Sequence, residues 1–370
     1  MEEPLITTSD SNCKKSNEER SFIDDLKLAE EGDAESQFAV GMAYYEGEGV
    51  VQDKNQAAEW YRKAAKQDFV PAQVLLGLVY DEGDGVNVDK KEAANWYRKA
   101  AEHGNEDGQF LLGCCYESGE GVEQNIQEAI KWWTLSANQG LADAQFNLGN
   151  AYWNGDGVTE SKETATILYR KAAEQGDARA QYHLANCYSF GEGVAENPEE
   201  AFRWYKKAAE QDIAEAQFYL GRSYHYGAGV KENEEKALWW NRKAAEAGIA
   251  EAQYNLGISY FYGDGVAEDL EIAAFWWKRA AEQGEESAQN NLGHSYEHGL
   301  GVEKNEKEAV RLYRLSAEQN FPAAQYNLGE AYMKGMGVEK NHEEAIKWFK
   351  LAADQGDEDA IKALEELKAK

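Results

Sequence analysis

A Gly-x-Gly-Val turn recurs along the chain and is the first candidate for chemistry. Its first glycine recurs every 36 residues, at Gly47, Gly83, Gly119, Gly155, Gly191, Gly227, Gly263, Gly299 and Gly335. A phosphate loop points backbone N–H groups at an anion, usually after a strand and with a lysine nearby. Here Asp or Glu separates the glycines in six of nine turns, and no Lys-Ser or Lys-Thr follows. We therefore interpret each turn as a helix end, where glycine adopts the left-handed conformation without a Cβ penalty.

A pair of histidines is the second candidate. His294 and His298 are four residues apart, with Glu297 between them and Glu330 further along the chain. On a helix this spacing places two imidazoles on one face, as in some zinc sites. Zinc needs a third and usually a fourth ligand, which the sequence does not fix. Two surface histidines are the alternative, and neither a metal nor a cofactor is predicted.

Signatures of catalysis are missing from the sequence. It contains no Gly-x-Ser-x-Gly, no His-Glu-x-x-His and no Walker sequence. Most carboxylates fall in expected turns or at helix starts, where they complement the helix dipole. Basic pairs such as Arg62-Lys63 and Arg170-Lys171 fall near helix C-termini, and we interpret them as an outer helical face. The prediction is a protein that is not an enzyme.

The net charge and the cysteine content indicate which classes of partner, and which cellular compartment, are compatible with this chain. The 370 residues carry a formal net charge of −30, which repels phosphate backbones and anionic lipid surfaces. The four cysteines show no repeating spacing, as expected of reduced thiols. The N-terminus has no apolar signal region, and no later apolar run is long enough to cross a bilayer. We expect a cytoplasmic protein that binds neither nucleic acid nor membrane, with signal-independent export left open.

The 36-residue period divides the chain into nine units, numbered here as repeats one to nine. The predicted organisation is a disordered tail (1–20), a capping helix (21–32), nine repeats (33–68, 69–104, 105–140, 141–176, 177–212, 213–248, 249–284, 285–320, 321–356) and a second capping helix (357–370). A stacked array needs such caps to close its two apolar ends.

Each repeat is predicted to hold two helices. In repeat seven, Ala252, Leu256 and Tyr260 form one apolar stripe at helical spacing, and Ala273, Trp277 and their neighbours form another. Candidate N-caps of the second helices occur in all nine repeats: Asp53, Asp89, Asn125, Ser161, Asn197, Asn233, Asp269, Asn305 and Asn341. Pro71, Pro198 and Pro322 fall where helices should begin.

These motifs resemble the Sel1-like repeat, a relative of the tetratricopeptide repeat. Residues 250–284 show the pattern in full, from Ala-x-Ala-Gln-Tyr-Asn-Leu-Gly through Gly-x-Gly-Val to Lys-Arg-Ala-Ala-Glu-Gln-Gly. The departures are Ala185 for a close-packing glycine, Leu168 and Leu312 for Trp, and Asn241 for Tyr. The resemblance implies an all-α, right-handed α-solenoid whose first helices line a concave groove, with the role of an adaptor for protein partners. A secreted branch with two cysteines per repeat is linked to penicillin-like compounds, but this chain lacks that pattern.

Residues that break the repeat pattern on the first helices are the candidate partner-binding residues. Counted from Asp33 as position 1, positions 7, 10, 13 and 14 should face the groove. The candidates are Asn147, Asn150, Trp153, His183, Asn186, Phe190, Tyr219, Arg222, His225, Tyr226, Asn255, Phe261 and Tyr262. The aromatic residues are predicted to anchor a partner. The alternative is that they pack between adjacent first helices.

The amides at positions 7 and 10 suggest a ladder that hydrogen-bonds the backbone of an extended peptide. The alternative is that they are solvated parts of the repeat pattern. Only Arg222 and Lys334 are basic among the groove positions, which argues against a clamp for a terminal carboxylate. The surplus of acid favours a neutral or basic protein or peptide partner. The predicted function is a non-catalytic binding scaffold; alternatives are a structural subunit or spacer, or an enzyme or metal-binding protein with a site in the groove.

Overall fold

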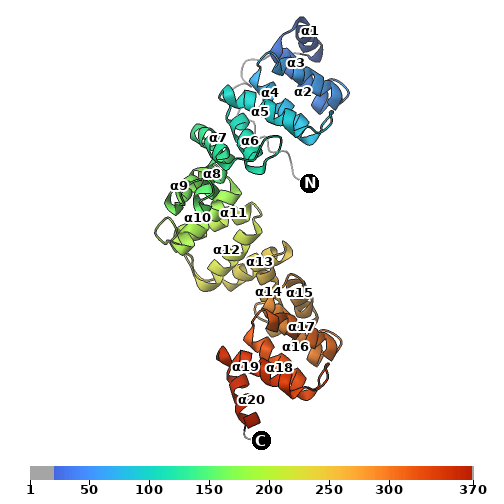
Figure 1. The fold of residues 1–370 in the computed structure, drawn as a ribbon, viewed down its shortest axis with the longest axis vertical. Coiled ribbons are helices and arrows are strands. Elements are labelled where there is room, and N and C mark those ends of the chain that lie inside the picture. Colours follow the sequence, from blue (N-terminus) through green and yellow to red (C-terminus); the bar gives the residue numbers. More distant parts are fainter. Residues whose placement is uncertain (1–20, 369–370) are drawn as a thin grey trace. The chain divides into compact units, whose positions relative to one another are not determined.

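A computed structural model describes residues 21–368, and every regular element in that range is an α-helix (Figure 1). The predicted tail, residues 1–20, lies outside the described residues. The helices are α1 (Phe22–Glu31), α2 (Ala34–Glu46), α3 (Lys54–Ala65), α4 (Val70–Glu82), α5 (Lys90–Glu102), α6 (Glu106–Ser118), α7 (Ile126–Gln139), α8 (Ala142–Asn154), α9 (Lys162–Glu174), α10 (Ala178–Phe190), α11 (Pro198–Glu210), α12 (Ala214–Tyr226), α13 (Glu234–Glu246), α14 (Ala250–Tyr262), α15 (Leu270–Glu282), α16 (Glu286–His298), α17 (Glu306–Glu318), α18 (Pro322–Lys334), α19 (His342–Asp354) and α20 (Glu358–Lys368).

The helices form two compact units that divide at Asp177. The first unit contains α1 to α9 and the second contains α10 to α20. Within each unit, consecutive helices pack against one another, and each repeat contributes one pair (Figure 1). The prediction of an all-α protein built from helical repeats is confirmed. Among residues 21–368, none of the helices combines the length and apolar character that a bilayer crossing requires.

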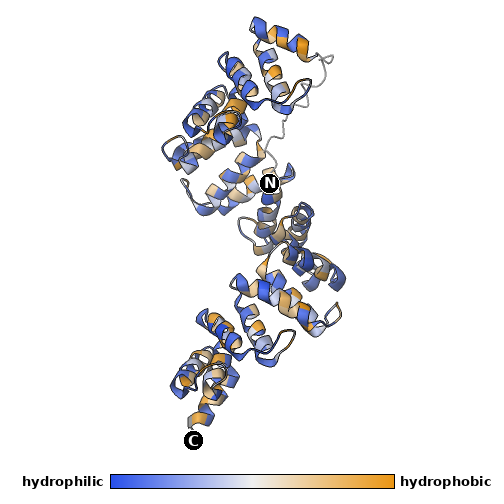
Figure 2. Ribbon diagram, turned by 90° about the vertical axis from the view of Figure 1, so that its right-hand side faces the viewer, coloured by the Kyte–Doolittle hydropathy of each residue, from blue (hydrophilic) through white to orange (hydrophobic). Residues whose placement is uncertain are grey.

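In seven of the nine repeats, the two helices meet through an aromatic ring that covers a glycine. In repeat seven, a Cβ added to Gly257 would lie 2.4 Å from Trp277, so a larger residue would require the ring to move. Leu256 and Trp277 are buried beside it. Figure 2 shows apolar and hydrophilic residues sharing the same helices, as expected when each helix buries one stripe.

The Gly-x-Gly turn is a helix end, as predicted. Gly263 caps α14 with φ 74°, and the N–H of Asp269 donates to the carbonyl of Tyr260 at 2.9 Å, which folds the turn back on its own helix. The second glycine meets the preceding repeat: a Cβ on Gly301 would lie 1.9 Å from the carbonyl oxygen of Leu270. Both glycines are thus required by conformation or by space, and neither role involves an anion.

Local caps define the starts of the second helices. The predicted N-caps are confirmed, because each of the nine side chains accepts from the backbone N–H of N2, N3 or both: Asp53, Asp89, Asn125, Ser161, Asn197, Asn233, Asp269, Asn305 and Asn341. Pro71, Pro198 and Pro322 stand in first turns, also as predicted. Several first helices instead begin after an apolar residue with no side-chain cap, such as Ile213 and Ile249.

A pair of glutamines joins the two helices of most repeats. In repeat seven, Gln283 Nε2 donates to Gln253 Oε1 at 2.8 Å, and Gln253 Nε2 donates to the carbonyl of Ala245 at 3.0 Å. The same side-chain bond forms in seven repeats, as Gln67–Gln37, Gln139–Gln109, Gln175–Gln145, Gln211–Gln181, Gln283–Gln253, Gln319–Gln289 and Gln355–Gln325. We call it the glutamine link.

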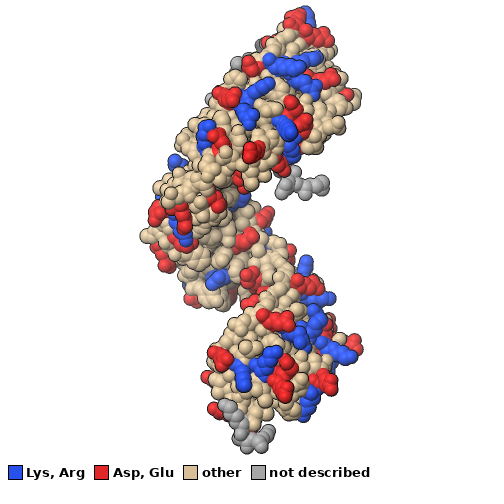
Figure 3. Space-filling view, in the orientation of Figure 1, with Lys and Arg blue, Asp and Glu red and all other residues tan. Residues whose placement is uncertain are grey.

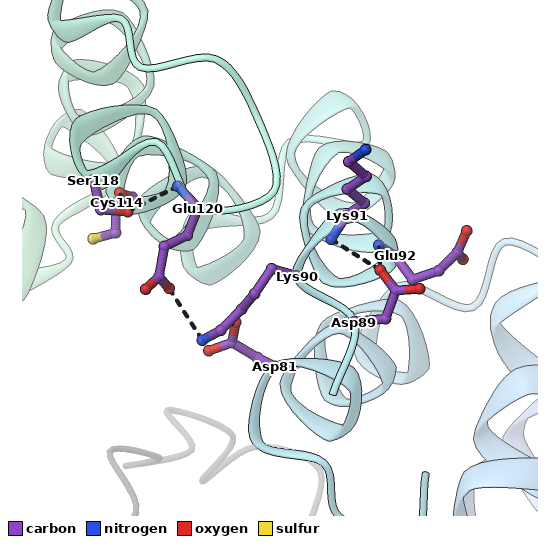
Figure 4. A network of polar contacts seen from close by, with 8 residues as sticks. All are labelled: Asp81, Asp89, Lys90, Lys91, Glu92, Cys114, Ser118 and Glu120. Carbon is purple, nitrogen blue, oxygen red and sulfur yellow. Dashed lines mark hydrogen bonds and ion pairs between the residues drawn. The ribbon is translucent and has the colours of Figure 1, made fainter. Parts of the chain in front are cut away.

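Ion pairs add further links between repeats in the first unit. Lys90, the first residue of α5, lies 3.0 Å from both Asp81 of α4 and Glu120 in the turn after α6 (Figure 4). Lys54 contacts Asp84 of the next repeat at 2.7 Å in the same way. Exposed pairs of this kind contribute little to stability, on the order of 0 to 1 kcal/mol each. Charges of both signs are interspersed on the face seen in Figure 3.

Candidate functional site

Three aromatic side chains stand exposed at the same position of successive first helices. Phe190, Tyr226 and Tyr262 are the last residues of α10, α12 and α14, and they are 59%, 67% and 65% exposed. All three belong to the second unit. Each precedes the glycine of its turn, so the backbone holds the three side chains in equivalent places. We call these three residues the aromatic row.

The position-13 aromatics behave differently from the aromatic row. Trp153 is half-buried against Tyr169 of its own repeat, with ring centroids 6.1 Å apart, and Phe261 lies 5.1 Å from Trp277 in the same manner. Both therefore contact the second helix of their own repeat. His225, at the same position in repeat six, is exposed and bonds to Glu234 at 3.0 Å.

Several predicted amides serve the packing of the helices. Asn150 and Asn186 accept hydrogen bonds from the hydroxyls of Tyr169 and Tyr205, at 2.8 and 2.6 Å. Asn147 donates to Cys114 Sγ on the preceding first helix at 3.9 Å. These amides already have partners within the chain. Asn255 on α14 is exposed, and the peptide-ladder hypothesis stays a prediction there.

Repeats five and six share a group of stacked rings. Tyr219 is parallel to Tyr205, with centroids 5.2 Å apart and an interplanar angle of 10°, and lies 6.3 Å from Tyr182. Tyr182 in turn meets His183 edge to face at 5.4 Å. Tyr205 is buried, and burial raises its pKa above the usual tyrosine range, so its hydroxyl remains a donor to Asn186. Two predicted groove residues, His183 and Tyr219, are therefore linked indirectly, because both rings contact Tyr182.

Arg222 projects from α12 beside these rings. Its guanidinium carbon lies 5.8 Å from the Phe218 ring, 5.7 Å from Tyr219 and 6.0 Å from Tyr226 of the aromatic row. Cation–π contacts of this kind orient a guanidinium without occupying its N–H donors. The sequence placed Arg222 at a groove position, but it did not predict the aromatic surroundings.

Repeat six lacks both contacts that join helix pairs elsewhere. Asn241 stands where the other repeats carry an aromatic ring, so no ring covers Gly221, and the Asn241 amide donates instead to the carbonyl of Ala252 at 3.2 Å. Ala247 replaces the donor of the glutamine link, and the buried Oε1 of Gln217 has no hydrogen-bond partner among the described residues. The sequence signalled this through Asn241, whereas the role of position 247 became clear only from the structure.

Two exposed aromatics on second helices were missed by the sequence analysis. Trp239 on α13 and Phe275 on α15 are each 51% exposed, with Lys243 4.9 Å above Trp239 and Arg279 5.5 Å from Phe275. Their position holds a polar residue in six other repeats, such as Arg203 and Lys131. The change from a polar to an aromatic residue at this position was a signal in the sequence, but it lies on the second helices, outside the predicted groove.

The histidine pair lies on one helical face, as its spacing indicates. The rings of His294 and His298 are 4.4 Å apart. Burial and the neighbouring His298 lower the pKa of His294, which favours the neutral ring. Glu297 accepts from the Tyr313 hydroxyl at 2.7 Å, and Glu330 is paired with Lys334. Within residues 21–368 no three His, Cys, Asp or Glu side chains are grouped to hold a metal, so the metal hypothesis stays without a third ligand.

The adjacent cysteines are poor nucleophiles. Burial raises the pKa of Cys114 to about 12 and that of Cys115 to about 11. Because the thiolate is the reactive form, both side chains remain unreactive thiols at neutral pH.

Two solved structures resemble this chain over most of its length. One is c5321, a protective antigen present in uropathogenic Escherichia coli strains and displaying an SLR fold; it is 34% identical, covers 92% of this chain and 81% of its own, and has a TM-score of 0.76. The other is a Sel1 repeat protein from Oxalobacter formigenes, 29% identical over 95% of both chains, with a TM-score of 0.56. A search among curated proteins gives no match.

The family model for the Sel1 repeat matches nine consecutive segments. They are 34–69, 70–105, 106–141, 142–177, 178–213, 214–249, 250–285, 286–321 and 322–357. Each segment begins one residue after the start of the corresponding unit derived above from the glycine period. With the helix pairs, the ring-covered glycines and the two solved structures in agreement, the chain belongs to the Sel1 repeat family.

Proposed function

We propose that the chain is a non-catalytic scaffold that binds a protein or an extended peptide along its first helices. Sel1 repeat proteins typically mediate protein–protein interactions and are generally not enzymes. The observation that carries the proposal is the aromatic row of Phe190, Tyr226 and Tyr262, each more than half exposed. Exposed aromatics supply large contact areas and are enriched among residues that dominate binding energies.

The partner is neutral or basic in its overall charge. With 68 acidic against 38 basic residues, the chain repels acidic proteins and attracts basic ones during encounter. This steering falls with salt, over a screening length of about 8 Å at physiological ionic strength. Association should therefore slow as salt rises, even where the aromatic contacts retain the complex.

A capture experiment with matched variants tests the proposal. Bound proteins are compared between the wild type, a row variant with Phe190→Ala, Tyr226→Ala and Tyr262→Ala, and a control variant with Trp239→Ala and Phe275→Ala. The control removes similarly exposed aromatic side chains, but from second helices. Circular dichroism verifies that both variants remain folded.

The expected result is that the row variant loses partners that the control variant keeps. Retention of every partner by the row variant would overturn the role of the aromatic row. Loss in the control variant alone would move the binding surface to the second helices and contradict the proposal as stated.

A further inference from the structure

Arg222 is a cation without a carboxylate partner in a strongly acidic chain. It is exposed, and among the described residues it makes no ion pair, although the sequence holds 68 Asp and Glu. Arg203 and Arg311 pair with Glu200 and Glu308 at 3.0 and 2.7 Å. Four other arginines donate instead to tyrosine hydroxyls: Arg62, Arg98, Arg242 and Arg314. Arg222 has neither kind of acceptor among the described residues, a situation that Arg279 shares. The absence of such a neighbour at Arg222 leaves its N–H donors available.

Three aromatic rings flank the guanidinium of Arg222. Its carbon lies within 6.0 Å of three rings, those of Phe218, Tyr219 and Tyr226. Tyr219 is itself stacked on Tyr205, whose hydroxyl is bound by Asn186. Ring contacts of this kind favour the rotamers that lie along the aromatic surface, and a planar guanidinium loses less entropy per hydrogen bond formed.

The departure of repeat six explains why Arg222 is free. Asn150 and Asn186 occupy the same position in repeats four and five, where each accepts the hydroxyl of the second-helix tyrosine. Repeat six has Asn241 in place of that tyrosine, and Asn241 is bonded to Ala252. The position that serves packing in its neighbours is therefore released from packing in repeat six.

We infer that Arg222 receives the carboxylate of an Asp or Glu side chain from the bound segment. A guanidinium fork matches a carboxylate with two parallel hydrogen bonds, and the flanking rings suit an apolar residue beside that acid. A side chain fits better than a chain terminus, because nearby His225 is bonded to Glu234 and the other basic groove residue, Lys334, is paired with Glu330. The inference rests on the proposed function and adds one acidic contact to a partner that is otherwise neutral or basic.

Selection from a random peptide library tests the inference directly. The peptides are displayed inside a loop of a carrier protein, so that no free C-terminus is present. The library is selected separately on the wild type, Arg222→Gln, Arg222→Glu and the control Arg203→Gln, which alters an exposed arginine of α11 that is already paired. All four proteins are verified as folded by circular dichroism.

We expect the wild type and the control to enrich peptides with one Asp or Glu next to an aromatic or aliphatic residue. Arg222→Gln should lose this acidic preference, and Arg222→Glu should replace it with Lys or Arg. An end-capped synthetic peptide from the wild-type pool should bind about 10- to 100-fold more weakly when its acid is changed to the amide, and equally weakly to Arg222→Gln. Combining the two changes should add little further loss.

The outcomes separate the inference from the proposed function. Peptides that depend on Tyr226 but show no acidic preference, or keep one on Arg222→Gln, would overturn the inference and leave the scaffold proposal standing. A library that yields no peptide above background would count against both.

Discussion

Repeats six and seven have the same helix pair but different contacts inside it. In repeat seven the Trp277 ring covers Gly257, and Gln283 completes the glutamine link to Gln253. In repeat six no ring covers Gly221, and the Oε1 of Gln217 has no partner among the described residues. The backbone fold of a repeat therefore tolerates the loss of both contacts, because its neighbours supply the rest of the burial.

Positions 10 and 13 also differ between the two repeats in how far their side chains take part in helix packing. Position 13 of repeat seven is Phe261, packed against Trp277, whereas position 13 of repeat six is the exposed His225. Position 10 of repeat six is Arg222, which makes no ion pair within residues 21–368. Arg222 and His225 are thus released from helix packing in repeat six, and both proposals use residues of this repeat.

The largest expected effect comes from removing the ring of repeat seven. Trp277→Ala deletes a side chain that is 2% exposed, and this should destabilise the helix pair by about 3 to 5 kcal/mol. Asn241→Ala in repeat six removes one hydrogen bond and should cost about 1 kcal/mol. Hydrogen exchange of the backbone amides in α12 to α15 measures the loss of local stability in each of the two variants. Equal losses would mean that the ring is not what distinguishes the two repeats.

The glutamine link can be removed from repeat seven or added to repeat six, with opposite expected effects on stability. Gln283→Ala leaves the buried Oε1 of Gln253 without its donor and should cost about 1 to 3 kcal/mol. Ala247→Gln supplies a donor to Gln217 and should stabilise repeat six by about 0.5 to 1.5 kcal/mol. Urea unfolding followed by circular dichroism compares the two variants with the wild type. A lower urea midpoint for Ala247→Gln than for the wild type would show that a donor to Gln217 does not stabilise repeat six.

The two glycines should differ in their tolerance of alanine. In Gly257→Ala the new Cβ meets Trp277 at 2.4 Å, and the overlap should cost about 1 to 2 kcal/mol after the gain in helix propensity. In Gly221→Ala the nearest atoms are at 3.2 Å, so the change should be close to neutral. Repeat five carries Ala185 at this position, which shows that a ring can adjust and keeps the expected cost modest. The thermal unfolding midpoints of the two variants are compared. A lower midpoint for Gly221→Ala than for Gly257→Ala would contradict the prediction.

The smallest effect concerns pH at position 10 of repeat eight. The pKa of His294 is lowered in the folded chain, so the unfolded chain takes up the proton more readily. The stability contributed by the neutral ring is therefore complete above the unfolded pKa of about 6.5 and is lost as pH falls through it toward the lower folded value. His294→Asn introduces the residue found in repeats four and five. Between about pH 7 and pH 5, the range in which histidine titrates, the thermal unfolding midpoint of His294→Asn should fall less than that of the wild type. If the two midpoints fall equally, the loss of stability at low pH does not come from His294.

Local chemistry made much of the fold predictable. The N-caps, the first-turn prolines and the left-handed glycines depend on a few neighbouring residues, and Asp269, Pro198 and Gly263 all stand where the sequence placed them. The 36-residue period then fixed the order of the helices, because each unit must bury its stripes against the next.

The candidate site was harder to predict because exposure depends on contacts between helices. Trp153 and Tyr226 are both aromatic and both lie at variable positions, yet Trp153 packs on Tyr169 and Tyr226 is 67% exposed. Helical spacing gives the direction of a side chain but not whether a ring from the next helix already occupies that space. For the same reason the hydroxyl partners of Asn150 and Asn186 were not foreseen.

In repeat seven, the glutamine link and the second bond of Gln253 join three segments: α14, the end of α15 and, through the carbonyl of Ala245, the end of α13. Repeat six lacks this link, so its helix pair is expected to be less stable than those of its neighbours. We therefore expect heat, denaturant or a protease to open the second unit first at α12 and α13, the helix pair that contains Arg222 and Tyr226.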